Sequence, residues 1–153
     1  MKELIQYEQN GDVLDIKGTN QFLDIFISLL CLPWRGVHLG ASLAAKKLFK
    51  KIKIEGLESL CIRGYSMGGG IAQSLAVLIR RKRIPMDIII ELTGSYPALS
   101  EDMYVGDCSV RIYGNDPVPG LFPWFKYPHG SEIIHEGPPR KWWRINFKDH
   151  TRY

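Results

Sequence analysis

The sequence predicts an α/β fold: a mostly parallel central sheet, helices on both faces of that sheet, and an antiparallel hairpin at the amino-terminal end. Strand-like and helix-like patterns alternate through the middle of the chain, which is typical of parallel strands joined by crossover helices. Asn10-Gly11, a strong hairpin signal, separates two β-prone runs at residues 4–7 and 13–17. The 153 residues are 45% hydrophobic and 24% charged, so we expect one globular domain spanning residues 1–153.

Two amphipathic helices are expected between the strands. Apolar residues recur at helical spacing from Ala41 to Ile52 and again from Gly69 to Arg81. The basic run Arg80-Arg81-Lys82-Arg83 ends the second helix, where cations suit the helix dipole. In chain order, we expect strands at residues 4–7, 13–17, 59–63, 86–92, 109–113, 132–135 and 143–147, and helices at residues 41–52 and 69–81.

The charge and cysteine content exclude several classes of protein. A net charge of +4 is mild and suits solubility. The three cysteines, Cys31, Cys61 and Cys108, lack metal-ligand spacing, so we expect reduced core residues and neither a metal site nor a disulfide framework. We expect no signal peptide and no transmembrane segment, because the longest apolar run, residues 22–34, is short and contains Asp24. The chain is therefore expected to be cytoplasmic at synthesis, with its final site open.

The sharpest motif is Gly64-Tyr65-Ser66-Met67-Gly68, which lies between an expected strand and an expected helix. In a nucleophile elbow, a serine occupies such a tight strand-to-helix turn, and the flanking glycines avoid steric collisions. The alternative is a glycine-rich turn with a serine of no special role. We expect Ser66 to be a nucleophile.

A serine nucleophile needs a base and an orienting acid, because its hydroxyl is unreactive at neutral pH. In this arrangement the acid and then the histidine follow the serine along the chain. Asp107 and Asp116 are the acid candidates, and Asp116 is better placed because it follows the strand expected at residues 109–113. Three histidines come after it, and spacing does not choose among them: His129, His135 and His150.

Several motifs, taken in order, resemble the class 3 lipase family, the fungal-type triacylglycerol lipases. The resemblance covers nearly the whole chain from residue 13 onward. The motifs are Asp15-Ile16-Lys17-Gly18-Thr19-Asn20, Val37-His38-Leu39-Gly40, Gly64-Tyr65-Ser66-Met67-Gly68-Gly69, Thr93-Gly94-Ser95-Tyr96-Pro97, Asn115-Asp116-Pro117-Val118-Pro119, and Asp149-His150 with Tyr153. Lys17 departs from the pattern, because the family usually has arginine there.

The resemblance implies a minimal α/β-hydrolase fold that hydrolyses carboxylic esters of lipids without a metal or organic cofactor. Ser66 matches the family's nucleophile, Asp116 its acid and His150 its base, whereas His129 matches a non-catalytic histidine. Thr19 matches the oxyanion-hole position, where it would act together with the backbone N–H of Met67. The segments between these residues are short, so we expect a shallow acyl groove.

Two further segments bear on the substrate. Residues 21–35 occupy the interval of the family's lid, and they form either a short apolar lid or an ordinary buried helix. The apolar residues proposed for this lid are Phe22, Ile25, Phe26, Leu29 and Leu30. The run Arg140-Lys141-Trp142-Trp143-Arg144 suits an anionic membrane interface, although a packed strand with solvated flanks is the simpler and favoured interpretation.

The sequence thus predicts a serine esterase acting on lipid esters, in transient contact with a membrane or lipid interface. We expect no nucleic-acid partner, and the oligomeric state stays open. A phospholipase or an acyltransferase with the same triad is an alternative enzyme. From another class, the chain could be a non-catalytic lipid- or protein-binding module on the same fold.

Overall fold

A six-stranded sheet forms the centre of the protein in a computed structural model, which describes residues 5–17, 32–138 and 147–150. The strand order is β1-β2-β5-β6-β7-β8, and every neighbouring pair is parallel except the antiparallel β1–β2 hairpin. The strands are β1 (Tyr7–Asn10), β2 (Val13–Ile16), β5 (Ser59–Tyr65), β6 (Asp87–Thr93), β7 (Asp107–Tyr113) and β8 (Glu132–Glu136). The predicted α/β class, the mostly parallel sheet and the opening hairpin are confirmed, but the first strand lies at Tyr7–Asn10 and not at the predicted residues 4–7.

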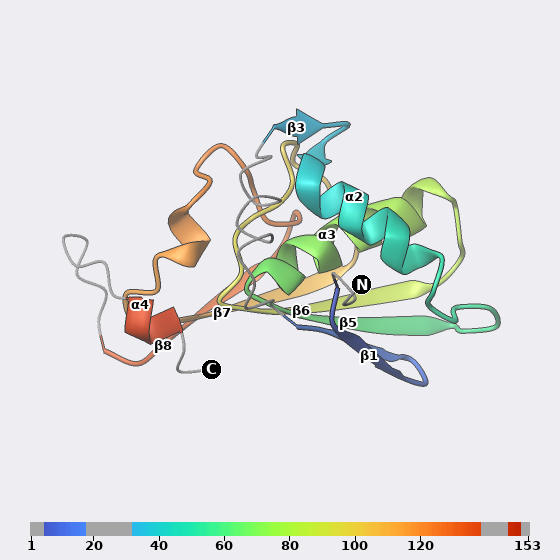
Figure 1. Cartoon of the computed structure of the whole chain (residues 1–153), viewed down its shortest axis with the longest axis horizontal. Coiled ribbons are helices and arrows are strands. Elements are labelled where there is room, and N and C mark those ends of the chain that lie inside the picture. Colours follow the sequence, from blue (N-terminus) through green and yellow to red (C-terminus); the bar gives the residue numbers. More distant parts are fainter. Residues whose placement is uncertain (1–4, 18–31, 139–146, 151–153) are drawn as a thin grey trace.

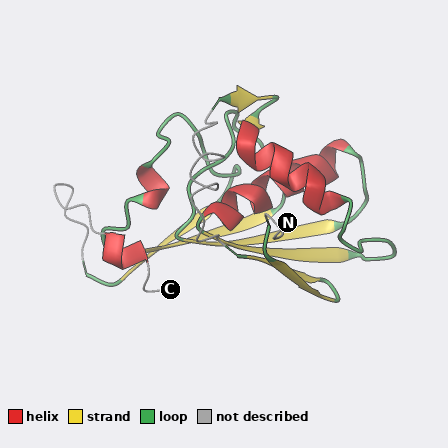
Figure 2. Ribbon diagram, viewed as in Figure 1, coloured by secondary structure: helices red, strands yellow, loops and turns green. Residues whose placement is uncertain are grey.

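Both long helices of the described part, α2 (Leu39–Phe49) and α3 (Met67–Arg81), lie on the same face of the sheet (Figures 1 and 2). The strand order explains this placement. From β2 to β8, each connection leads to the next strand in one direction across the sheet. Because crossovers between parallel strands are almost always right-handed, connections that all move one way place their helices on one face. The expected helices on the second face are therefore not found among the described residues.

The burial of the strands follows this one-sided arrangement. Residues of β5 and β6 that point toward the helices, such as Leu60, Ile62 and Ile90, are fully buried. Residues of the opposite face are half-buried or exposed, and the exposed side chains of Arg63 and Glu91 form an ion pair there at 2.7 Å. Alternation of buried and more exposed residues along each strand is typical of a sheet with one solvated face.

The other elements differ from the predictions in detail. An unpredicted short hairpin, β3 (Pro33–Trp34) and β4 (Val37–His38), precedes α2, and a 3-10 helix, η1 (Val118–Gly120), follows β7. The last described element is α4 (Phe147–His150). The strand predicted at residues 143–147 lies outside the described residues except for Phe147, which is helical.

His38 shows why α2 begins where it does. Its ring Nδ1 accepts a hydrogen bond from the Ala41 N–H at 3.3 Å and so caps the helix. The His38 side chain is fully buried, and its ring lies 5.2–5.3 Å from three aromatic rings, those of Tyr96, Phe122 and Phe125. This histidine is therefore part of the core.

Cys61 and Cys108 are free thiols, as predicted, and Cys31 lies outside the described residues. The predicted core position is confirmed for Cys108 and wrong for Cys61, which is only half-buried on the solvated face of β5. Burial raises the pKa of Cys108 to about 11. None of the helices in the described part of the chain is long and apolar enough to cross a bilayer.

Candidate active site

Ser66 lies in a strained turn between β5 and α3. Its backbone has φ 53° and ψ −121°, a region that non-glycine residues rarely occupy. The Ser66 N–H donates to the Thr93 carbonyl oxygen at 3.0 Å, and the Gly69 N–H donates to the Ser66 carbonyl oxygen at 3.1 Å. These bonds hold the turn between the end of β6 and the first turn of α3. The geometry is that of a nucleophile elbow.

The two glycines of the motif allow the strand and the helix to approach each other closely. A Cβ atom at Gly64 would lie 2.5 Å from the Cα of Gly69, and one at Gly68 would collide with the carbonyl oxygen of Ile16. Both contacts are with backbone, which cannot move aside cheaply. The G-x-S-x-G pattern is thus required by the local backbone.

The next two glycines make room for the segment that follows β6. A Cβ at Gly69 would collide with the Ser95 side chain, and one at Gly70 would collide with the Tyr96 hydroxyl group. Gln73, one helical turn further on, donates to the carbonyl oxygens of Gly69 at 3.1 Å and Tyr96 at 2.9 Å. The segment after β6 is therefore held against the first turns of α3.

The start of α3 lies beside the end of β2. A Cβ at Gly68 would contact Ile16 and would lie 3.0 Å from the carbonyl carbon of Lys17. Met67 is the first residue of α3, so its N–H belongs to the end of the helix that carries partial positive charge. Thr19, the other predicted oxyanion-hole residue, follows Lys17 by two positions and lies outside the described residues.

Asp116 lies at the same edge of the sheet as Ser66. It follows the carboxyl end of β7, and its side chain is 1% exposed. Its Oδ1 accepts a hydrogen bond from the Val118 N–H at 2.9 Å. The pKa of Tyr65, the neighbour of Ser66, is raised by burial and then by the negative charge of Asp116. The charge of Asp116 therefore acts on the residue that precedes Ser66.

Asp107, the other acid candidate, lies at the opposite edge. It is the first residue of β7, is exposed, and accepts a hydrogen bond from the Tyr104 hydroxyl at 2.9 Å. Because β5 and β7 run in the same direction, the amino end of β7 is far from the carboxyl end of β5. The geometry favours Asp116.

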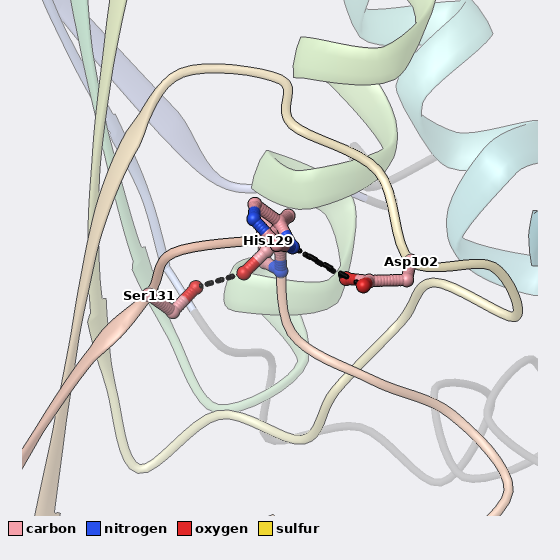
Figure 3. A network of polar contacts seen from close by, with 4 residues as sticks. Asp102, His129 and Ser131 are labelled. Carbon is pink, nitrogen blue, oxygen red and sulfur yellow. Dashed lines mark hydrogen bonds and ion pairs between the residues drawn. The ribbon is translucent and has the colours of Figure 1, made fainter.

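Two of the three candidate histidines have other environments. Figure 3 shows His129 against Asp102, with its Nδ1 at 3.1 Å from both carboxylate oxygens, and its side chain is 65% exposed. His135 is an exposed residue of the edge strand β8. Neither arrangement involves Asp116.

His150 lies in α4, and a buried aspartate anchors that helix beside Asp116. Asp149 is 4% exposed, and its Oδ2 accepts a hydrogen bond from the Asn115 N–H at 2.8 Å. Gly114 has φ 50°, and a Cβ there would lie 2.7 Å from the same oxygen. The turn after β7 thus binds Asp149 at residues 114–115 and carries Asp116, the candidate acid, at the next position. The His150 side chain itself is outside the described structure.

Sequence reasoning assigned no role to Asp149 or Gln73. A signal for Asp149 was present, because it directly precedes the candidate base. No periodic signal marks Gln73 as different from any polar helical residue, although its side chain is fully buried.

The predicted substrate-binding segments are not described. Phe22, Ile25, Phe26, Leu29 and Leu30 of the predicted lid lie outside the described residues, and so does the run at 140–144. A cavity of about 380 Å³ lies beside the elbow, but on the solvated face of the sheet. Its walls include Asp15, Arg63 and Glu91, which do not suit an acyl chain.

Comparison with known proteins yields no relative: no family model, no curated protein and no solved structure matches this chain.

Proposed function

We propose that the protein is a serine esterase that hydrolyses carboxylic esters of lipids, and that its fold is a minimal α/β-hydrolase of the class 3 lipase type. The observation that carries the proposal is the backbone of Ser66, which has φ 53° in a tight turn from a parallel strand to a helix. A strained residue of this kind persists where the surrounding structure requires it, and such residues cluster at active sites. The buried Asp116 at the same sheet edge supports the assignment.

The proposed reaction proceeds in two steps. The Ser66 Oγ attacks the acyl carbonyl carbon while His150 takes the hydroxyl proton, and Asp116 orients and stabilises the resulting imidazolium. The Met67 N–H and Thr19 donate hydrogen bonds to the tetrahedral oxyanion. His150 then protonates the leaving alcohol, and the acyl group remains on Ser66. His150 then deprotonates a water molecule, which attacks the acyl carbonyl carbon. The bond from that carbon to the Ser66 Oγ breaks, His150 returns the proton to this oxygen, and the carboxylic acid leaves.

The substrate class follows from the resemblance and from the apolar residues of the proposed lid. In this proposal, Phe22, Ile25, Phe26, Leu29 and Leu30 contact the acyl chain or cover the serine in water. A lid of this kind predicts that activity rises sharply once a soluble ester passes its aggregation threshold. A smooth saturation curve would count against the lid.

Labelling with a fluorophosphonate probe tests the nucleophile. We expect the wild-type protein and Ser59→Ala, a control at the start of β5, to be labelled, and we expect Ser66→Ala to remain unlabelled. If folded wild-type protein is not labelled, the catalytic assignment is wrong. Analysis of the products formed from acylglycerol and from phospholipid substrates then separates lipase from phospholipase activity. Adding an alcohol acceptor to the same reactions reveals acyltransferase activity.

A further inference from the structure

A basic groove lies away from the elbow, between the β3–β4 hairpin and the two long helices. It has a volume of about 220 Å³, and its lining combines apolar side chains with the polar and aromatic residues Trp34, Arg35, Lys46, Ser74, Arg81 and Lys82. Four of these are cations, and no acidic side chain of the described part lines the groove. Ser74 follows Ser66 by eight residues, so the groove begins roughly 12 Å along α3 from the elbow. We propose that this groove binds a phosphate group.

The fold gathers these cations from three separate segments and orients them. The Arg81 guanidinium donates to the Arg35 carbonyl oxygen at 2.5 Å, which ties α3 to the turn of the β3–β4 hairpin. The Arg35 guanidinium carbon lies 5.9 Å from the centre of the Trp34 ring, and the Lys82 Nζ lies 5.2 Å from that of Phe49. Such contacts reduce the freedom of the side chains before a ligand arrives.

Arg80, the neighbour of Arg81 in the sequence, shows that the basic run is not one uniform solvated patch. Its guanidinium donates to the carbonyl oxygens of Val105 at 2.8 Å and Met86 at 3.0 Å, so it serves the structure elsewhere. Arg81 and Lys82 instead line the groove. Glu101 approaches the hairpin turn near Arg81, where a Cβ at Gly36 would lie 3.4 Å from both side chains. Glu101 is one carboxylate against the four cations of the groove, so the surroundings of the groove remain positively charged.

A second observation comes from the wall of the groove. Ser74 is 3% exposed, and its Oγ is a buried side-chain atom without a hydrogen-bond partner in the described part of the chain. A buried hydroxyl group without a partner is unfavourable, and an acceptor oxygen would relieve that cost. Phosphate offers several acceptor oxygens and a charge that suits lysine and arginine.

The rim of the groove indicates how a lipid headgroup could reach it. Trp34, which lines the groove, is 48% exposed, and Leu32, two residues earlier in the chain, is 64% exposed. Tryptophan beside basic residues suits the headgroup level of a membrane. A phosphate could thus come from an anionic lipid or from a free phosphate ion, and the test separates the two sources.

The test measures binding by the full chain carrying Ser66→Ala, so that turnover does not intervene. One arm uses sedimentation with phosphatidylcholine vesicles that either contain or lack phosphatidic acid. The other arm uses calorimetric titration with inorganic phosphate. We expect binding in at least one phosphate arm and none to phosphatidylcholine alone. Binding only to phosphatidic acid vesicles would identify a lipid headgroup as the source, and saturable binding of inorganic phosphate would identify the free ion.

Two matched double variants decide whether the groove is responsible. Lys46→Gln with Lys82→Gln removes two charges from the groove, and Lys47→Gln with Lys50→Gln removes two exposed charges of the same region that do not line it. We expect the groove variant to bind about ten- to thirtyfold more weakly. The control should change by less than about twofold, although salt-sensitive attraction contributes to both. Equal losses in the two variants, or no binding in either phosphate arm, would overturn the proposal. Because binding is measured without catalysis, these results are independent of the proposed esterase activity.

Discussion

Replacement of Gly114 by alanine tests the connection between α4 and the turn that carries Asp116. Gly114 has φ 50°, and its missing Cβ leaves room for the Asp149 carboxylate, whose Oδ2 would be 2.7 Å from an added Cβ. A left-handed backbone costs a non-glycine residue about 1–2 kcal/mol. The added methyl group also displaces Asp149 from the Asn115 N–H, and a hydrogen bond to a charged group contributes about 1.5–3 kcal/mol. We expect a total loss of about 2.5–5 kcal/mol in the free energy of unfolding.

Gly56→Ala is the matched control for this variant. Gly56 also has a left-handed backbone, with φ 78°, but no atom lies within 4 Å of a Cβ built there. The control therefore retains the backbone cost and lacks the displacement of Asp149. Urea denaturation of both variants isolates the contribution of Asp149 as the difference, which we expect to be about 1.5–3 kcal/mol.

The same pair of variants tests the proposed position of His150. If α4 presents the base, then moving Asp149 moves the base as well, and a displacement of about 1 Å can slow a reaction by about a hundredfold. We expect the rate of fluorophosphonate labelling to fall in Gly114→Ala and to stay near the wild-type rate in Gly56→Ala, both measured below their unfolding transitions. Asp149→Asn keeps an acceptor oxygen and should recover part of the rate that Asp149→Ala loses. Equal stability and equal labelling in the two glycine variants would refute the reasoning.

Two further predictions concern the core. Gln73→Ala removes the acceptor of the Ala98 N–H and a donor to two carbonyl oxygens, so we expect urea denaturation to show a loss of about 2–4 kcal/mol; a loss below about 1 kcal/mol would contradict this role. The folded state raises the pKa of Cys108 from 9.0 to about 11, so its neutral thiol supports the fold fully below pH 9 and loses that contribution as the pH rises toward 11. Between pH 8 and 11, wild-type protein should lose about 2–3 kcal/mol more than Cys108→Ala, and parallel pH profiles would exclude the effect.

The elements that sequence reasoning predicted well are those with a strong local cause. The helix predicted at residues 69–81 is α3 (Met67–Arg81), and the strand predicted at 59–63 is β5 (Ser59–Tyr65). Each has a regular apolar period, and the glycine motif marks the junction between them. The sequence failed to predict elements that lack such a regular apolar period. The β3–β4 hairpin has only two residues in each strand, and its turn at Arg35-Gly36 interrupts an apolar stretch.

In the candidate site, too, the features with a local sequence signal were predictable, and the contacts between distant segments were not. The elbow at Ser66 was predictable because its strained turn needs glycine at defined neighbouring positions, and those positions are visible in the sequence. The choice between Asp107 and Asp116 follows from the direction of β7, which places one at each edge of the sheet. The docking of Asp149 on Gly114 and Asn115 joins residues 34 or more positions apart, and no local pattern encodes such a contact.

By itself, the sequence determined the α/β class, the opening hairpin and the turn that carries Ser66, because hydrophobic period and glycine sterics act over a few neighbouring residues. Only the tertiary structure decided that α2 and α3 share one face of the sheet, because that depends on the order in which the strands pair. It also decided which cations meet at the basic groove and which carboxylate holds α4. These contacts join distant segments, and their partners become neighbours only when the sheet assembles.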